Sequence, residues 1–131
     1  MSLSEDSSAA QLSYSISEKP PFAVVIFVGE LTKATISVLD DCQKDLSERA
    51  GTLFVLVMRD VMTVDLKAFG ALTQFQKLLR DKGELRICSV KSEIRKFLIE
   101  MAVIRDTECF DNLAESLESL KCAQAKMKLV K

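Results

Sequence analysis

The feature that most constrains this fold is the alternation of wholly apolar runs with amphipathic segments. The runs FAVVIFV (22–28) and LFVLVM (53–58) are apolar at every position, so neither would have a polar face to expose to solvent as a strand. A strand of this kind is typical of a parallel sheet that helices cover on both faces. Because each run is followed by a segment with helical periodicity, the sequence predicts an α/β domain with a mixed, mostly parallel sheet.

About five strands and four interleaved helices are expected. The strands are predicted at 12–17, 22–28, 51–58, 84–90 and 108–110. The helices are predicted at 32–49, 66–83, 91–103 and 112–130. Pro20 and Pro21 interrupt pairing after the first strand, which favours an edge strand followed by a central one.

The first two helices carry the clearest signals. Thr32 or Thr35 is expected to cap the first helix, since a hydroxyl side chain can accept a hydrogen bond from a free backbone N–H. The second helix is expected to end at Gly83. Its apolar stripe is predicted to consist of Leu66, Phe69, Leu72, Phe75 or Gln76, and Leu79.

One globular domain is predicted, because 131 residues with 48% hydrophobic composition suit a single core. The Ser-rich and acidic start, residues 1–11, is predicted to be a disordered tail, and the domain itself is expected over residues 12–120. The basic end, residues 121–131, is expected to extend the last helix, where its lysines complement the helix dipole. A membrane-surface or partner-binding tail is the alternative.

Charge and hydropathy exclude several classes of partner. A net charge of -1 offers no attraction to nucleic acid or to anionic lipid, so no nucleic-acid partner is expected. No apolar run approaches the ~20 residues that cross a bilayer, and the polar start is not typical of a signal peptide. We therefore expect a soluble, cytoplasmic protein without a membrane span.

Side chains suited to catalysis are scarce. The chain has no histidine, and its four cysteines form no CxxC pair, so no metal site is expected. The thiols of Cys42, Cys88, Cys109 and Cys122 are interpreted as buried or incidental. No glycine-rich phosphate loop follows any strand, and no cofactor is expected. These absences favour a protein that is not an enzyme.

The acidic residues Asp40, Asp41 and Asp65 superficially match the trio of a phosphate-accepting receiver domain. The match fails, because Asp40 and Asp41 fall inside a predicted helix and the segment from there to Asp65 is too short for the intervening helices and strands. We interpret Asp40 and Asp41 as part of a solvated helix face.

The junction TVDLKAFGAL (63–72) joins the second apolar strand to the second helix and breaks a local rule. Acidic and hydroxyl side chains are favoured at a helix N-terminus, and Asp65 is well placed to cap the helix. Lys67 is a cation in the first turn, where the helix dipole mildly disfavours it.

Several stretches resemble, in order and spacing, the STAS domain, named for sulfate transporters and bacterial anti-sigma factor antagonists. They are FVGELTKATISVLDDCQKDL, the stretch from Gly51 to Val90, EIRKFLIEMAV and CFDNLAESLESL. The loop GEL (29–31) stands where the family has GELD, and VDLKAFGAL (64–72) stands where it has DSSGLGAL. The resemblance covers residues 12–120 and implies a single STAS-like domain.

In the antagonists of this family, the serine after that aspartate is a phosphorylation switch. Without phosphate the domain binds an anti-sigma factor, often a kinase of the histidine-kinase-like ATPase fold, and so regulates bacterial transcription. Here Asp65 matches the aspartate and Leu66 the phosphorylated serine. Lys67 and Ala68 replace the second serine and the first glycine, and Val57 replaces an acid at the end of the preceding strand. The resemblance implies an interaction module with a degenerate switch, since Leu66 has no hydroxyl.

The partner-binding surface is expected at the start of the second helix and in the adjoining loop. It is predicted to comprise Gly29, Glu30, Leu31, Thr32, Lys33, Asp65, Leu66, Lys67 and Ala68. Lys67 is interpreted either as a fixed charge at the former switch or as a drifted surface residue. Phosphorylation of Thr63 or Thr73 remains an open alternative. A homodimer is a further open alternative.

Two alternative functions are retained. The first is a STAS subunit of a larger machine, such as a signalling complex or a lipid-transport ABC system. The second is a sensor of a small anionic ligand or nucleotide, with Lys33 and Lys67 meeting the anion. The sensor is disfavoured because the junction has few converging donors, and because Ala68 hinders close backbone approach where the family has glycine.

Overall fold

The computed structural model describes residues 10–130, with side chains to residue 126. Its strands are β1 (Leu12–Lys19), β2 (Phe22–Leu31), β3 (Leu53–Val64), β4 (Glu84–Cys88) and β5 (Cys109–Phe110). Its helices are α2 (Ile36–Ser47), α3 (Phe69–Lys82), α4 (Ser92–Glu100) and α5 (Leu113–Val130). Three short 3-10 turns are η1 (Lys33–Thr35), η2 (Leu66–Ala68) and η3 (Asp106–Glu108). The predicted tail lies outside the described residues except for positions 10 and 11, as do the side chains of the last five residues.

All five strands form one mixed sheet in the order β1-β2-β3-β4-β5. β1 and β2 are an antiparallel hairpin, whereas β2–β3, β3–β4 and β4–β5 pair in parallel. The predicted α/β class is therefore confirmed, with the hairpin's first strand at the edge of the sheet. Parallel pairing places the carboxyl ends of β2 and β3 at the same edge.

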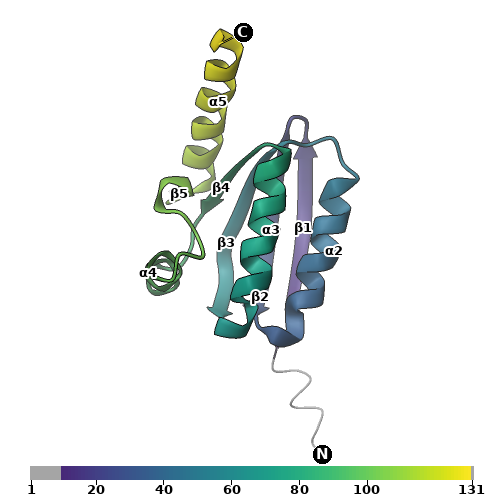
Figure 1. Ribbon diagram of the computed structural model, residues 1–131, viewed down its shortest axis with the longest axis vertical. Coiled ribbons are helices and arrows are strands. Elements are labelled where there is room, and N and C mark those ends of the chain that lie inside the picture. The colour runs from purple at the N-terminus through teal and green to yellow at the C-terminus, as the bar shows by residue number, and fades with distance from the viewer. Residues whose placement is uncertain (1–9, 131) are drawn as a thin grey trace, which may run out of the picture.

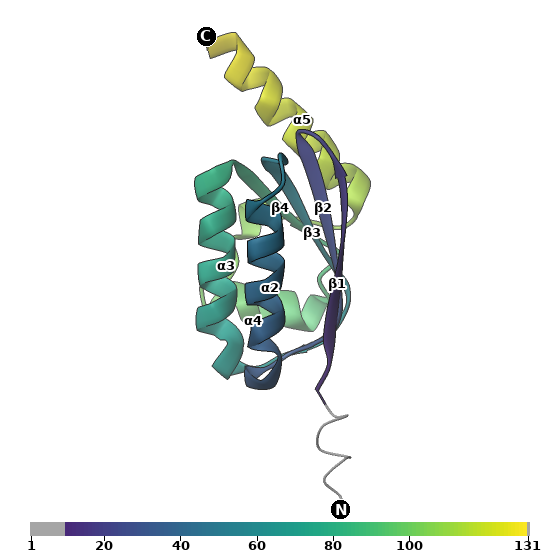
Figure 2. The same cartoon turned by 90° about the vertical axis from the view of Figure 1, so that its right-hand side faces the viewer.

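Helices cover the two faces of the sheet unequally. α2 and α3 lie side by side on one face, while α5 crosses the opposite face, which we call the outer face (Figures 1 and 2). The larger core cluster lies under α2 and α3 and includes Phe27, Phe54 and Phe75. The smaller one lies under α5, where Leu120 clusters with Val55. The last part of α5 extends beyond the sheet (Figure 1).

The two central strands run further than the sequence predicts. β2 continues to Leu31 and β3 to Val64, because β-bulges keep the two strands paired through a polar stretch. Polar side chains are tolerated there because they are solvent-exposed, Arg59 at 73% and Asp60 at 47%. Val57 consequently lies within β3 and not at its end, where the resemblance placed it.

Short 3-10 turns precede α2 and α3, and the apolar periodicity does not reveal them. Since a 3-10 turn has three residues per turn, η2 puts the first member of the predicted stripe out of phase. Leu66 is 59% exposed, so its assignment to the core stripe was wrong. Leu72, Phe75, Gln76 and Leu79 are buried as predicted.

Two glycines provide a matched test of this architecture. Gly29 has a φ of 128°, and a Cβ there would collide with the carbonyl of Gln11, which accepts a 2.8 Å hydrogen bond from the N–H of Glu30. Gly29→Ala is therefore expected to lower the free energy of unfolding by at least about 1–3 kcal/mol. Gly70 lies in α3, and apart from its chain neighbours and the backbone of its own helix no atom lies within 4 Å of the position that a Cβ would take. Gly70→Ala is therefore expected to raise the free energy of unfolding by about 0.4–1 kcal/mol. Equilibrium urea unfolding measures both, and equal stabilities would contradict the placement of Gly29.

Candidate functional site

The two segments predicted to bind a partner meet at the carboxyl ends of β2 and β3. Glu30 is in register with Thr63, and Leu31 with Val64. The backbone N–H of Asp65 then donates a 2.8 Å hydrogen bond to the carbonyl of Leu31. The end of β2 and the start of η2 are therefore held together by main-chain bonds, which side-chain substitutions leave in place.

Asp65 caps the helix start, as the sequence predicts. Its side chain accepts a hydrogen bond of 3.2 Å from the N–H of Lys67, and its carbonyl accepts one of 2.9 Å from the N–H of Ala68. The backbone of Asp65 is extended and becomes helical only from Leu66 onward, as an N-cap requires.

A capping box shapes the neighbouring start of η1. The hydroxyl oxygen of Thr32 accepts a hydrogen bond from the N–H of Ala34, and the hydroxyl oxygen of Thr35 accepts one from the N–H of Thr32. The Thr35 hydroxyl in turn donates a 2.7 Å bond to the carbonyl of Glu30. Thr32 is thus the side chain that caps this turn, and buried Thr35 ties the turn back to β2.

The predicted surface residues differ in exposure. Leu66, Lys67 and Lys33 are exposed, and Leu66 is the most apolar of them. Leu31 and Ala68 are fully buried, so they support the surface from below and cannot touch a partner. The others are half-buried: Gly29, Glu30, Thr32 and Asp65.

The two lysines of this surface have no anionic partner. Among the residues with described side chains, no carboxylate lies within 4.0 Å of the ammonium group of Lys33 or Lys67. Positive charge is therefore available to a partner at the helix start, next to an exposed leucine.

An apolar patch continues from the helix start onto α4. Leu66, three residues before Phe69 in the chain, is 59% exposed at the helix start. The ring of Phe69 lies 5.5 Å from that of Phe97, centroid to centroid. Phe97 is 40% exposed, and Met101, one turn later, is 49% exposed. We call these four side chains the α3–α4 patch.

The contribution of α4 to this surface was not predicted from the sequence. A signal was present in the run FLI (97–99), because three consecutive apolar residues cannot all face one core. In the structure Leu98 is fully buried, which turns Phe97 toward solvent. The contact between Phe97 and Phe69 depends on tertiary packing and has no local signature.

The hydroxyl groups near the switch position lie apart from it. Thr63 is at the end of β3 and Thr73 is inside α3, and both are exposed. Neither occupies the first residue of η2, which is Leu66. A phosphate at the position that the resemblance implies would have no oxygen to attach to.

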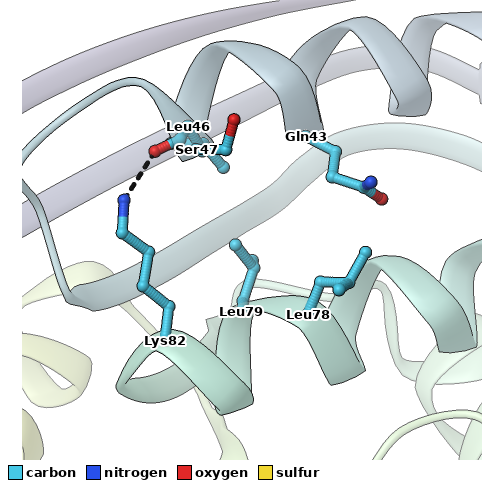
Figure 3. Close-up of a pocket in the computed structure, with 6 residues that line it drawn as sticks. All are labelled: Gln43, Leu46, Ser47, Leu78, Leu79 and Lys82. Atoms are coloured by element: carbon cyan, nitrogen blue, oxygen red, sulfur yellow. Dashed lines mark hydrogen bonds between the residues drawn. The ribbon is translucent and has the colours of Figure 1, made fainter.

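A groove between α2 and α3 bears on the alternative of a small-ligand sensor. It has a volume of about 140 Å³ and is lined by Gln43, Leu46, Ser47, Leu78, Leu79 and Lys82 (Figure 3). The Lys82 ammonium donates hydrogen bonds of 2.8 and 2.7 Å to the carbonyls of Leu46 and Arg49. Its charge therefore caps the end of α2, and the groove presents no free cation to an anionic ligand.

The cysteines show no reactive arrangement. Cys42, Cys88 and Cys109 are buried, and burial raises the pKa of Cys42 to about 12 and that of Cys109 to about 11. Burial also raises the pKa of the Cys88 thiol. Within the described residues, no three His, Cys, Asp or Glu side chains gather as a metal site would require.

None of the described helices combines the length and apolar character that spanning a bilayer demands.

Comparison with known sequences identifies a family. The chain matches the STAS domain over residues 13–129. No curated protein matches it significantly.

Solved structures share this fold at low sequence identity. An anti-sigma factor antagonist from Mycobacterium paratuberculosis matches with a TM-score of 0.73 at 12% identity, over 85% of this chain and 95% of its own. A variant of RsbS from Moorella thermoacetica matches with a TM-score of 0.71 at 20% identity, over 86% of this chain and 97% of its own. The murine anion transporter Slc26a9 matches with a TM-score of 0.78 at 12% identity, over 92% of this chain but only 24% of its own.

The cap at Asp65 can be tested by two substitutions. Asp65→Ala removes the acceptor for the Lys67 N–H and is expected to lower the free energy of unfolding by about 0.5–2 kcal/mol. Asp65→Asn keeps a side-chain oxygen and is expected to stay close to the native protein. Urea unfolding compares the three proteins, and an unchanged Asp65→Ala variant would show that the cap contributes nothing.

Thiol labelling tests the burial of the cysteines. Iodoacetamide in mildly alkaline buffer is expected to label only the exposed Cys122 in the folded protein, and all four thiols in denaturant. Mass spectrometry counts the adducts. A Cys122→Ser variant should stay unlabelled while folded, and adducts on Cys42 or Cys109 before unfolding would contradict the structure.

Proposed function

This chain belongs to the STAS domain family, and we propose that it is a non-enzymatic protein-interaction module of the anti-sigma factor antagonist type. Its partner is an anti-sigma factor or a related serine kinase of the histidine-kinase-like ATPase fold, met in the bacterial cytoplasm. The proposal is supported by structural neighbours that include an anti-sigma factor antagonist and RsbS.

The observation that carries this proposal is the α3–α4 patch at the start of α3. Leu66 (59%), Phe97 (40%) and Met101 (49%) are three of the large apolar side chains that the described surface exposes. Neighbouring exposed apolar side chains, rimmed by polar groups, are typical of protein-binding sites. The unpaired ammonium groups of Lys33 and Lys67 add positive charge beside the patch, which suits a partner with carboxylates around an apolar centre.

Binding at this surface is not controlled by phosphate on the first residue of η2. A phosphoryl group there would add roughly two negative charges and expel an acidic partner. Leu66 cannot accept it, and Lys67 places a permanent positive charge on the next residue. We infer an interaction regulated through the amount or state of the partner.

A STAS subunit of a larger machine is the second candidate. One observation favours it, the structural match to a domain that makes up about a quarter of the Slc26a9 chain. In that case the α3–α4 patch contacts another subunit of the assembly. The small-ligand sensor finds less support, because Lys82 of the groove between α2 and α3 is engaged with backbone carbonyls.

Substitutions on the patch test the proposal against a binding partner, such as an anti-sigma kinase encoded beside this gene. Leu66→Ala and Phe97→Ala are each expected to weaken binding about ten- to a hundredfold, since burying such a side chain contributes roughly 1.5–3 kcal/mol. Leu66→Asp should weaken it further by desolvating a charge. Isothermal titration calorimetry gives the affinities.

Melting temperatures and a matched control keep this test interpretable. The two Leu66 variants should melt close to the native protein, because Leu66 is 59% exposed. Phe97→Ala should melt somewhat lower, because Phe97 is 40% exposed and its ring packs on Phe69. Val28→Ala removes an apolar side chain that is 47% exposed on the outer face and should leave affinity unchanged. Full affinity in a folded Leu66→Asp variant would rule out this surface, whichever partner is used.

A further inference from the structure

A second groove lies on the outer face of the sheet, away from the α3–α4 patch. It has a volume of about 280 Å³ and is lined by Ser17, Lys19, Phe22, Val24, Leu117 and Lys121. These residues come from the turn end of the β1–β2 hairpin and from the middle of α5, which runs past that end of the sheet (Figure 2). The groove exists because α5 packs mainly on β3, β4 and β5 and leaves the hairpin partly uncovered.

The floor of this groove is apolar. Phe22, Val24 and Leu117 are half-buried and pack against the smaller core cluster, so one side of each contacts the core and the other stays accessible to solvent. An apolar chain laid on them would bury surface that α5 does not reach, which is favourable at about 25 cal/mol per Å².

The rim of the groove is cationic. Lys19 and Lys121 are both exposed, and no acidic side chain lines the groove. Within the described side chains, neither ammonium has a carboxylate within 4.0 Å. The adjacent Glu18 does not neutralise Lys19, because it lies on the other side of the strand, where it pairs with Arg49.

We propose that this groove binds a single-chain amphiphilic anion, of the chemical class of a medium-chain fatty carboxylate. The alkyl chain lies on Phe22, Val24 and Leu117, and the carboxylate pairs with the ammonium groups of Lys19 and Lys121. The hydroxyl of Ser17 is a further donor on the β1 side of the groove. This site is independent of the protein-binding surface at the start of α3.

Size distinguishes this ligand from bulkier ones. A volume of about 280 Å³ lies just below the range of roughly 300–1,000 Å³ typical of small-molecule sites, which suits one alkyl chain better than two. A partner helix is about 10 Å across with its side chains, so it needs a longer and wider contact surface than the six lining residues provide. The lysines select an anion, and the floor selects an apolar chain.

Nuclear magnetic resonance with ¹⁵N-labelled protein tests the proposal, using sodium decanoate below its micelle concentration. Saturable shift changes are expected for residues 17–24 and 117–121. Sodium hexanoate should bind at least about tenfold more weakly, because it buries fewer methylene groups. Neutral 1-decanol at the same concentration should bind less tightly than decanoate.

Lysine variants separate the contribution of the two ammonium groups to binding from that of apolar contact with the groove floor. The double variant Lys19→Gln/Lys121→Gln is expected to weaken decanoate binding about fivefold or more, from two exposed ion pairs of modest strength. Lys126→Gln, exposed on the same helix but outside the groove, is the matched control and should bind normally. The absence of saturable shifts, shifts centred on the α3–α4 patch, or equal binding of decanol and decanoate would each overturn the proposal. So would binding only to anionic phospholipid vesicles.

Discussion

Parallel pairing of β2 with β3 is the interaction on which the rest of this structure depends. It carries the two most apolar segments of the chain into the centre of the sheet and forces α2 to return between them as a crossover. It also fixes where the two strands end, and the bond from the Asp65 N–H to the Leu31 carbonyl closes the ladder at that point. The start of α3 and the capped turn η1 are neighbours only because this ladder runs to its last residue.

The first residue of a helix at such a strand end can carry a phosphate, whose charge is reversible, or an apolar side chain, whose contact area is permanent. With a hydroxyl at the first position, a phosphate would meet free N–H groups and the helix dipole. With Leu66 there, the same position offers apolar contact area, and Lys67 adds a charge that does not change. The α3–α4 patch favours the second use, since Phe69 and Phe97 enlarge the apolar area that one leucine provides.

The two faces of the sheet have unequal cover, and this asymmetry has consequences for binding. On one face, α2 and α3 close over a continuous core, and the bidentate pair of Arg80 with Glu108 ties α3 to η3. On the other, α5 covers β3, β4 and β5 and leaves the β1–β2 hairpin partly open. Apolar residues of β2 thereby belong to the core and to a surface groove at once.

The sequence by itself determined the α/β class, the order of elements and the cap at Asp65, because these follow from local periodicity, strand apolarity and the preferences of helix ends. Local signals did not reveal the 3-10 turns or the bulges, so Leu66 was placed in the apolar stripe of the helix as well as on the binding surface, and β3 was ended early. Only the tertiary structure decided which predicted surface residues are accessible, burying Leu31 and Ala68. It alone brought Phe97 to Phe69 and Leu117 to Phe22, since contacts between distant elements depend on how helices dock on the sheet and have no periodicity of their own.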